Sequence, residues 1–551
     1  MSIKDYVFRS RLGILLLLFT SALIAFSEVL IALSMKKGLE IVLESKSEQL
    51  PMLIGIFIGI ILLSVFGYYL KGVSGAYYKK SILTSLKDDY ADSLINMSIK
   101  EFQTHKIGEI SSTMTNDINK LETQYFDVIL KSVQQGMSFL FASVTMVYFS
   151  PMLTLCIYLL VIVVMFAPRK THKQMSDLGL AFSNTMADYS TKIQEILGGF
   201  EVIKSFGATK KMKSEIQILS KESEEARFQI GKKESKVIGI LGGLSLITFY
   251  IPFLIGTIFV LNGSIEVGVL MAVVNLSGSI INPVQQFGGN MASLKVGEGI
   301  FNNILKTINR DSLSVQTNQK IDTPSISSNL CLKHGITLEN VSFSYKEQPI
   351  LKDISMQLDK GKKYLVIGPS GSGKSTLLKV LMGFYDDYSG SIKIDDLELK
   401  DINKNDLSRL IAYVPQDVFM FNRSIRENII FNSPLNEEKL EKVCKQAALE
   451  DVINELEDGL DTVLGDGSQK LSGGQMQRIA IARALCHEAK ILLVDEATAS
   501  LDEHNSIKIN DILLSLNQMV IYVTHKMPEE QLVKFDQIIK MENGSVEYAS
   551  E

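Results

Sequence analysis

Six apolar stretches in the first half of the chain constrain its fold more than any other feature of the sequence. A helix that crosses a bilayer needs about 20 mostly apolar residues, because the hydrocarbon core is about 30 Å thick. The stretches that meet or approach this length are 12–33, 52–70, 128–149, 152–167, 237–261 and 267–290. We therefore predict a polytopic α-helical membrane domain with six spans over residues 1–305.

The lysine and arginine residues between these stretches predict their orientation. The connections after the second and fourth stretches are long and basic, whereas those around Ser150 and 262–266 contain neither Lys nor Arg. Basic residues are retained in cytoplasmic loops. We therefore predict a multi-pass protein of the cytoplasmic membrane, with both termini and both long connections in the cytoplasm.

The two long connections have helical periodicity and few helix breakers, so we expect the spanning helices to continue out of the bilayer. Each connection has one turning point, at 98–108 and at 205–211. Polar tips of this kind either contact a cytosolic domain or are solvated loops. Both interpretations stay open on physical grounds.

Polar residues inside the apolar stretches are candidates for contact with a transported molecule. Glu28 is ionisable and therefore costly at membrane depth, unless a polar partner satisfies it near the outer leaflet. Five polar residues recur every three or four positions in the last stretch: Asn275, Ser279, Asn282, Gln286 and Asn290. They share one helical face, which we interpret as the lining of a cavity rather than as hydrogen-bonding glue between helices. Gln134 and Gln135 are a weaker indication of the same kind.

Beyond residue 335, short β-rich runs alternate with helical patterns. The runs are 336–345, 363–367, 411–414, 490–494 and 519–524. This alternation is typical of an α/β domain with a largely parallel core sheet, in which ligands bind at the C-terminal ends of the strands. We predict such a domain over 336–551, joined to the membrane domain by a polar linker, 306–335. A net charge of -5 gives no argument for a nucleic-acid partner, since that function usually shows itself as a clustered basic face.

Residues 368–375 read Gly-Pro-Ser-Gly-Ser-Gly-Lys-Ser, between a strand-like run and a helical one. Gly371 and Gly373 allow backbone N–H groups to curl around phosphate oxygens, and the following helix N-terminus favours an anion. Lys374 can reach the outer phosphates, and the Ser375 hydroxyl suits a Mg²⁺ ion. The glycine loop therefore predicts a nucleoside triphosphate site, with a chance glycine-rich turn as the alternative.

An apolar run that ends in two carboxylates, Asp495 and Glu496, follows later in the chain. A buried strand that places Asp495 beside Ser375 would complete the Mg²⁺ shell, directly or through water. Glu496 is then placed to orient or deprotonate the attacking water. The alternative is a structural pair of charges at a helix N-terminus.

A second helix start of the phosphate-binding kind lies at 471–475, which reads Leu-Ser-Gly-Gly-Gln. A Ser and two Gly at a helix N-terminus form a ready-made anion site. One nucleotide cannot easily satisfy both this helix start and the glycine loop within one chain. The pair of sites suggests two copies that share nucleotides.

These motifs appear in the order and spacing of the ATP-binding cassette family, which the chain resembles over essentially its whole length. The matching segments are 368–375 (Walker A), Gln416 (Q-loop), 471–475 (signature), 491–496 (Walker B), 500–502 (D-loop) and His525 (switch histidine). Residues 425–428 and 195–207 also match. With six spans ahead of the cassette, the chain is similar to half-transporters of the multidrug and peptide exporter type.

The resemblance implies roles for residues at matching positions. The nucleotide-binding residues it implies are Tyr345, Gly368, Ser370, Gly371, Gly373, Lys374, Ser375, Thr376, Ser472, Gly473, Gly474, Gln475 and Asp502. Among them, Tyr345 would stack on adenine, Ser472 to Gly474 would close on the nucleotide of the opposite chain, and Asp502 would link the two sites.

The implied catalytic residues are Glu496, His525 and Gln416. His525 would hold the γ-phosphate as charge develops. Gln416 would join Ser375 and Asp495 at the metal and pass the state of the site to the membrane helices. The turning points at 98–108 and 205–211 match the coupling helices of the family. Asp466, before the signature, replaces the Glu of many relatives.

The function implied by the resemblance is ATP-driven export of an amphipathic or hydrophobic substrate across the cytoplasmic membrane. Drugs, peptides and lipids are all transported by such exporters, with ATP and Mg²⁺ as cofactors and alternating access in a dimer. We expect a homodimer in contact with the bilayer. A bacteriocin or peptide-pheromone exporter, a lipid-specific exporter and one half of a heterodimer are the alternatives.

Overall fold

The computed structural model describes residues 2–105, 107–166, 169–318, 332–346, 348–434, 436–465, 471–498, 503–525 and 527–548. The expected D-loop with Asp502, the position Asp466 and part of the predicted linker lie outside the described residues. The chain divides into two compact units, a helical unit (Met1–Asn96 with His105–Thr317) and a sheet unit (Met97–Thr104 with Asn318–Glu551). The domain boundaries at 305 and 335 stay predictions.

The helical unit is built from helices that contain the apolar stretches predicted as spans, except for residue 167, which lies outside the described residues. Its elements are α1 (Ile3–Val7), α2 (Arg11–Leu43), η1 (Ser47–Gln49), α3 (Leu50–Asn96), α5 (Ile107–Ser112), η2 (Thr113–Asp117), α6 (Ile118–Leu121), η3 (Glu122–Phe126), α7 (Asp127–Phe149), α8 (Pro151–Phe166), α9 (Arg169–Gly198), α10 (Phe200–Ser205), α11 (Thr209–Leu261) and α12 (Val267–Asn318). In the described residues, α2, α3, α11 and α12 are long and apolar enough to cross a membrane, and α8 is a shorter apolar helix. Helix α7 contains the remaining predicted span.

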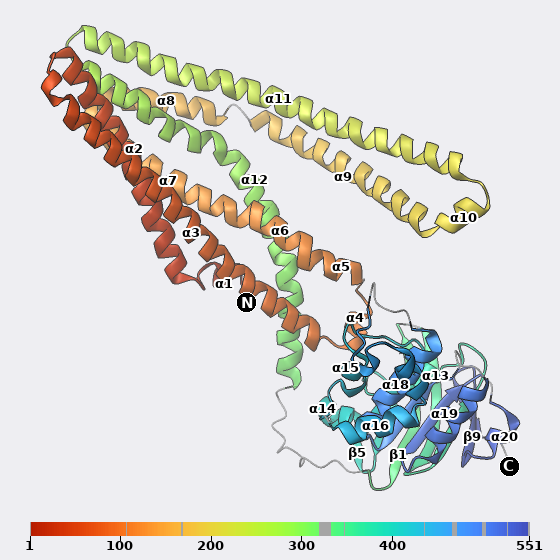
Figure 1. Ribbon diagram of the computed structural model, residues 1–551. Coiled ribbons are helices and arrows are strands. Elements are labelled where there is room, and N and C mark those ends of the chain that lie inside the picture. Colours follow the sequence, from red (N-terminus) through yellow and green to blue (C-terminus); the bar gives the residue numbers. More distant parts are fainter. Residues whose placement is uncertain are drawn as a thin grey trace. The chain divides into compact units, whose positions relative to one another are not determined.

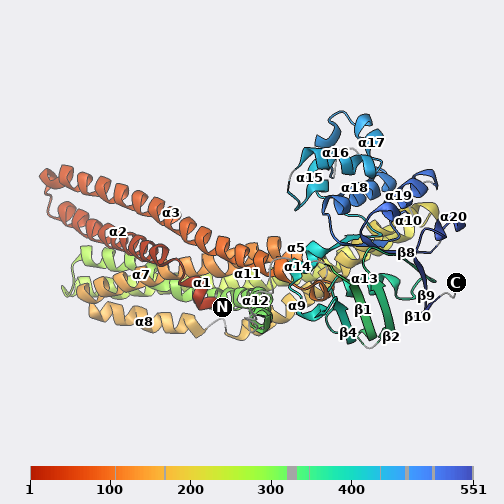
Figure 2. The ribbon, with the colours of Figure 1, turned by 90° about the horizontal axis from the view of Figure 1, so that it is seen from below.

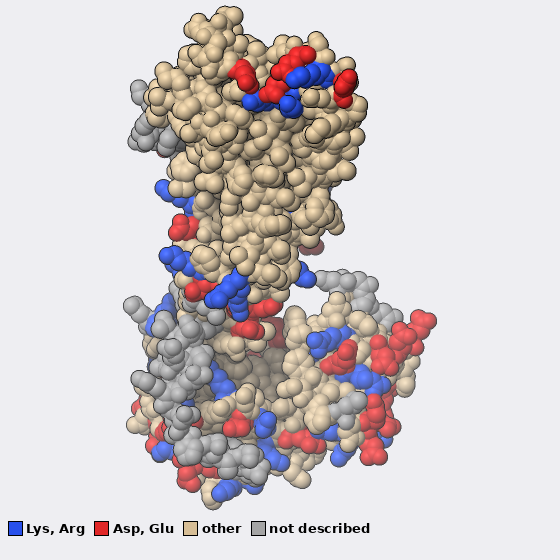
Figure 3. All heavy atoms as spheres, turned by 90° about the vertical axis from the view of Figure 1, so that its left-hand side faces the viewer, with Lys and Arg blue, Asp and Glu red and all other residues tan. Residues whose placement is uncertain are grey.

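Several of these helices continue well beyond the apolar segments, as the periodicity of the connections predicts. Helices α9 and α11 pack along one another and are joined through α10 (Figures 1 and 2). Figure 3 shows a broad belt of the helical unit without Lys, Arg, Asp or Glu, with charged side chains at both ends. At the α2–α3 end these charges include the ion pairs Lys37–Glu40 and Lys46–Glu44. A charge-free belt of this kind suits contact with lipid.

Two apolar clusters hold the helical unit together. One joins α2, α7, α8 and α12 around Ala142, Met146 and Leu276. The other surrounds Phe126 and Phe301, whose ring centroids lie 6.1 Å apart. Small residues allow close approach of the helices, since a Cβ on Gly67 would lie 3.3 Å from Ile24.

The sheet unit contains two β-sheets and a set of short helices. One sheet is antiparallel in the order β2 (Gln348–Asp359), β1 (Gly335–Tyr345), β4 (Ser389–Ile394), β5 (Leu397–Glu398). The other has the order β10 (Ser545–Tyr548), β9 (Gln537–Glu542), β3 (Lys363–Ile367), β8 (Met519–Thr524), β7 (Ile491–Asp495), β6 (Ile411–Val414). The helices are α4 (Ile99–Phe102), α13 (Lys374–Leu381), η4 (Leu399–Asp401), α14 (Lys404–Leu410), α15 (Ile425–Ile430), α16 (Glu437–Gln446), α17 (Glu450–Glu455), η5 (Gly459–Asp461), α18 (Gly473–Cys486), α19 (Glu503–Ser515) and α20 (Glu529–Leu532).

The parallel strands β3, β8, β7 and β6 bring the motifs to one edge. Ile367 pairs with Thr524 and Asp495 with Val523, so the C-terminal ends of β3, β8 and β7 are level. Strand β7 is buried on both faces, with Ile491 and Leu493 in one core cluster and Leu492 and Val494 in the other. This explains its continuous apolar run. The predicted largely parallel α/β sheet is confirmed, whereas the antiparallel sheet was not predicted.

The first turning point of the long connections forms α4, which is grouped with the sheet unit. Ser98 caps the helix, and its side chain and that of Glu101 form a reciprocal capping box. Lys100 Nζ lies 2.7 Å from Asp387 Oδ2. The first tip therefore contacts the sheet unit. The second, 205–211, runs from the last residue of α10 through a turn, where Phe206 is exposed, into the start of α11.

Candidate functional site

The glycine loop connects β3 to α13 and has a conformation that requires glycine. Gly371 and Gly373 have φ angles of 79° and 103°, which residues with a Cβ atom rarely adopt. A Cβ on Gly368 would lie 2.1 Å from the carbonyl oxygen of Met541. The loop therefore turns tightly into the N-terminus of α13, as a phosphate cradle must.

Lys374 is the first residue of α13 and is folded back onto this loop. Its Nζ donates to the carbonyl oxygens of Gly368 and Pro369, both at 2.8 Å. Burial lowers the pKa of Lys374, and the nearby carboxylates of Glu496 and Asp495 partly oppose this shift. The ammonium group thus lies at the loop and close to both carboxylates, where it can meet an anion.

Ser375 and Asp495 meet as the sequence predicts. Ser375 Oγ donates to Asp495 Oδ1 at 3.0 Å, and Tyr413 Oη donates to Asp495 Oδ2 at 3.1 Å. Asp495 is 2% exposed. Burial, followed by the charge of Asp495, raises the pKa of Tyr413, so that this hydroxyl stays protonated and orients the carboxylate. A hydroxyl and a buried carboxylate side by side are the oxygen ligands that Mg²⁺ accepts.

Glu496 lies between the two other predicted catalytic residues. Gln416 Nε2 donates to Glu496 Oε2 at 2.8 Å, and His525 Nε2 lies 2.7 Å from Glu496 Oε1. The other ring nitrogen of His525 lies 3.2 Å from the carbonyl oxygen of Gly368. The side chains from the ends of β6, β7 and β8 therefore converge beside the glycine loop.

The backbone at Glu496 is strained. Its φ angle is 50°, in the left-handed region that non-glycine residues rarely occupy. The conformation is held by Glu496 N–H, which donates to the Val523 carbonyl at 2.9 Å, and by Gln477 Nε2, which donates to the Glu496 carbonyl at 3.3 Å. Strain of this kind concentrates at functional sites, where surrounding contacts hold the side chain in place.

Tyr345 lies at the end of β1, half-buried. Its ring packs edge-on against Phe343 at a centroid distance of 5.0 Å. Burial, with the hydrogen bond to Tyr385 as the next cause, raises the pKa of Tyr345. The side chain of Thr376, in the first turn of α13, opposes this rise in the pKa of Tyr345, so the predicted base-stacking residue is close to the phosphate loop.

The predicted signature residues form the N-terminus of α18. Ser472 is the cap: its Oγ accepts the N–H of Gln475 at 3.2 Å, and Gln475 Oε1 accepts the N–H of Ser472 at 2.8 Å. Ser472 and Gly473 are exposed. The N-terminus of α18 is therefore capped and accessible to a ligand or a partner.

The predicted polar stripe of α12 has two kinds of environment. Ser279 Oγ donates to Glu28 Oε2 at 3.0 Å, and Asn290 Nδ2 donates to Gln135 Oε1 at 3.2 Å. These residues link α12 to α2 and α7. Asn275 and Asn282 are exposed, and Gln286 is half-buried. Gln134 donates to Ser138 within α7 at 3.2 Å.

Comparison with known proteins agrees with this geometry. Residues 14–284 match the model of the ABC transporter transmembrane region, and residues 351–499 match that of the ABC transporter domain. A probable ABC transporter ATP-binding/permease protein of Haemophilus influenzae is 31% identical over 502 residues, which cover 86% of this chain and 85% of that protein. The chain belongs to the ABC transporter family. Its N-terminal transmembrane domain is fused to a C-terminal ATP-binding domain, so it is a half-transporter of the exporter type, an ATPase coupled to transport.

Two further proteins, both exporters by their descriptions, are similar to this ABC half-transporter. An ATP-dependent lipid A-core flippase of Vibrio vulnificus is 26% identical over 485 residues, covering 87% of this chain and 81% of that protein. The structure of a bacterial Atm1-family ABC exporter with ATP bound superposes with a TM-score of 0.79 at 21% identity, over 98% of this chain and 95% of that chain. At that identity the likeness shows the fold alone.

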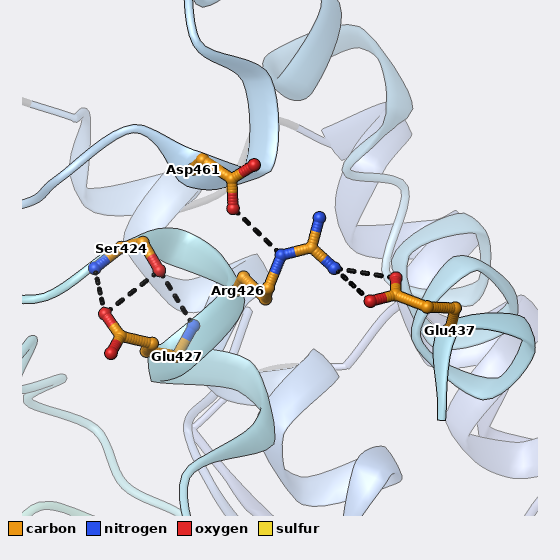
Figure 4. A network of polar contacts seen from close by, with 5 residues as sticks. All are labelled: Ser424, Arg426, Glu427, Glu437 and Asp461. Carbon is orange, nitrogen blue, oxygen red and sulfur yellow. Dashed lines mark hydrogen bonds and ion pairs between the residues drawn. The ribbon is translucent and has the colours of Figure 1, made fainter. Parts of the chain in front are cut away.

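Arg426 and Glu427, within the matching segment 425–428, belong to a structural network with Ser424, Glu437 and Asp461 (Figure 4). Ser424 and Glu427 form a capping box at the start of α15. Arg426 Nη1 donates to both carboxylate oxygens of Glu437, at 2.7 and 2.6 Å, and its Nε donates to Asp461 at 2.9 Å. The hydrogen bonds of this one guanidinium group join α15, α16 and η5.

The sequence did not indicate several residues that support the site. Arg483 on α18 donates to the carbonyl oxygen of Asn428 at 2.7 Å and to its side-chain oxygen at 3.0 Å, which connects the signature helix to the segment after Gln416. Tyr413 and Tyr385 were also missed. A tyrosine in a strand or loop carries no local pattern that reveals its partner, because the partner comes from distant sequence.

Proposed function

We propose that this ABC half-transporter works as a homodimer that exports amphipathic or hydrophobic molecules by alternating access, driven by Mg²⁺-dependent ATP hydrolysis. The observation that carries the proposal is the position of Glu496, held between Gln416 and His525 beside the glycine loop. A carboxylate with both oxygens oriented is suited to accept a proton from water.

The other residues have distinct roles in this proposal. The glycine loop and Lys374 bind the phosphates, Tyr345 stacks on adenine, and Ser375, Gln416 and Asp495 hold Mg²⁺, which supplies charge neutralisation on the phosphates when bound. His525 contacts the γ-phosphate. The described residues contain no cluster of three or more His, Cys, Asp and Glu side chains suited to a metal. Phosphate and water would therefore complete the Mg²⁺ shell.

A second copy of the chain is proposed to supply Ser472, Gly473, Gly474 and Gln475 to each nucleotide, with Asp502 linking the two sites. Support comes from the exposed cap of α18. The α10 tip also has exposed apolar side chains, including Phe200 and Phe206. Exposed apolar patches of this kind are typical of interaction surfaces.

The proposed substrate region is the polar face of α12. Asn275, Asn282 and Gln286 are free to face a cavity, whereas Ser279 with Glu28 and Asn290 with Gln135 hold helices together.

A lipid-specific exporter is the second candidate, favoured by the flippase of Vibrio vulnificus. The distribution of Lys and Arg supports cytoplasmic termini and a cytoplasmic ATP-binding domain.

The proposal is tested with protein reconstituted into liposomes. Stimulation of ATPase activity by peptides, dyes and lipids identifies a substrate class, and ATP-dependent accumulation of that compound in inverted vesicles measures export. We expect accumulation with the wild-type chain and none with Glu496→Gln. Active hydrolysis without ATP-dependent movement of any of the three classes would contradict the proposal.

A further inference from the structure

A continuous chain of hydrogen bonds connects Tyr345 with the first cytoplasmic tip. Tyr345 Oη donates to Tyr385 Oη at 2.8 Å, and Tyr385 Oη donates to Gln103 Oε1 at 2.9 Å. Each hydroxyl has one proton, so these hydrogen bonds have a single direction, from Tyr345 to Gln103. Bonds ordered in this way polarise and strengthen one another.

Aromatic packing fixes the two tyrosine hydroxyls relative to each other. The centroid of Phe343 lies 5.0 Å from that of Tyr345 and 4.9 Å from that of Tyr385. The Tyr345 and Tyr385 rings meet edge-on at 5.4 Å. Tyr385 is 1% exposed. A displacement of the Tyr345 ring therefore has to displace Tyr385 as well, because packed side chains leave no free space.

The series of hydrogen bonds ends beside α4, which belongs to the same compact unit as these tyrosines. Gln103 directly follows α4, and Lys100 within α4 makes the ion pair with Asp387. The two charged side chains are 56% and 39% exposed, so solvent screens this pair and its contribution is small. The hydroxyl chain is thus the more specific of the two connections between α4 and the loop that contains Tyr385.

We propose that Tyr385 and Gln103 are positioning residues that transmit occupation of the base site to α4, and through it to the first cytoplasmic loop. A base stacked on Tyr345 restricts its ring, which orders Tyr385 and Gln103 and thereby the backbone of 97–104. The required ligand is a nucleoside triphosphate with an aromatic base. The inference rests on the proposed function in one respect, that Tyr345 stacks on the base.

Hydrogen–deuterium exchange of the full-length chain tests this relay, in a Glu496→Gln background that leaves ATP intact. MgATP is compared with magnesium tripolyphosphate, which has the phosphates and no base. We expect both to protect 368–376. We expect MgATP to slow exchange at 97–104 by about fivefold more than tripolyphosphate, because only the base engages the relay.

Variants that remove one hydroxyl or one acceptor should abolish this difference. In Tyr385→Phe and Gln103→Leu, the two ligands should give exchange rates at 97–104 within about 1.5-fold of each other. Gln103 is exposed, so its substitution leaves the core intact. Gln103→Glu keeps an oxygen acceptor and should retain the difference.

Tyr388→Phe is the matched control. Tyr388 is a buried tyrosine of the same loop whose hydroxyl has no hydrogen-bond partner among the described residues, so the same chemical change should leave the ATP-specific protection unchanged. Equal protection by ATP and tripolyphosphate in the parent protein would overturn the relay. So would a loss in Tyr388→Phe as large as in Tyr385→Phe. Absence of protection at 368–376 with either ligand would instead contradict the proposed nucleotide site.

Discussion

At the residue scale, the environment of Glu496 is the feature on which the proposed ATPase mechanism depends. Its two carboxylate oxygens have different partners, Gln416 and His525, and its backbone is held in a strained conformation. Neither partner carries a permanent negative charge, so the carboxylate meets no repulsion from them and keeps its orientation. A carboxylate held in this way is better suited to act as a general base than a mobile carboxylate on the surface would be.

Glu496→Gln should lower steady-state ATP hydrolysis by at least about 100-fold, because an amide cannot accept the proton of the attacking water. The amide is nearly isosteric, so binding of MgATP should persist. ATPase rates and equilibrium nucleotide binding measure the two effects. Glu488→Gln is the matched control, since Glu488 is exposed and pairs only with Lys439 in the described chain. Normal turnover in Glu496→Gln would refute the assigned role.

Cys444 provides a pH-dependent test of burial in the sheet unit. Burial, with the neighbouring Cys486 as a second cause, raises the pKa of the Cys444 thiol to about 11. A raised thiol pKa means less thiolate at a given pH, so at pH 8 only about one thiol in a thousand is ionised. We expect Cys444 to resist maleimide at pH 8 and to react about tenfold faster per pH unit as the pH rises toward 11.

The labelling is measured in a chain with Cys156 and Cys331 replaced by Ser, so that only Cys444 and Cys486 remain. Ser408→Cys in this background supplies an exposed thiol as the control. Denaturation should make all thiols react. Rapid modification of Cys444 in the folded protein at pH 8 would show that the cluster around α16 and α18 opens readily.

At the element scale, α12 combines packing and exposure on one polar face. Its spacing predicts a single stripe, but contacts with α2 and α7 divide that stripe. Ser279 and Asn290 hydrogen-bond to neighbouring helices, whereas Asn275 and Asn282 do not become buried. Helical periodicity identifies a shared face, but the neighbours of each turn decide what that face contacts.

Asn290→Ala and Asn282→Ala form a matched pair on this helix. Asn290→Ala should destabilise the helical unit by about 0.6 kcal/mol, the typical value of a hydrogen bond between membrane helices, and leave substrate preference unchanged. Asn282→Ala should alter the transport profile and leave stability unchanged. Thermal unfolding in detergent and transport of several dyes, peptides and lipids measure the two effects. The reverse outcome would assign Asn282 to packing.

At the scale of the whole molecule, the half-transporter fold implies a dimer. Each chain has one glycine loop and one exposed signature helix start. If the two chains share each nucleotide, as proposed, ATP binding draws the two copies together. The free energy of closure then acts on both membrane domains at once, which suits a symmetric exporter.

Complementation between two inactive chains tests this sharing. Lys374→Ala removes the lysine proposed to bind phosphate, and Ser472→Arg blocks the proposed signature contact. If each site combines the two motifs from different chains, a mixed dimer keeps one intact site, and co-expression should restore about a quarter of wild-type ATPase for random pairing. Each variant alone should be inactive. Failure of the mixture to exceed the single variants would argue for sites within one chain.

The amino-acid sequence by itself determined the long apolar helices, the parallel core sheet and the convergence of the motifs. Apolar length sets a span, and the C-terminal ends of parallel strands must meet at one edge, so Ser375, Asp495, Glu496 and His525 were bound to lie together. Local spacing encodes these features. The roles of the site residues and the orientation stay predictions until they are measured.

Only the tertiary structure decided which side chains from distant segments touch. The antiparallel sheet, the support of Asp495 by Tyr413, the division of the α12 stripe and the bond from Tyr385 to Gln103 each depend on segments that are far apart in sequence. The periodicity of residues within one segment does not predict such contacts. They arise because burial of the whole core fixes backbone positions first, and polar side chains then find the partners that this packing places within reach.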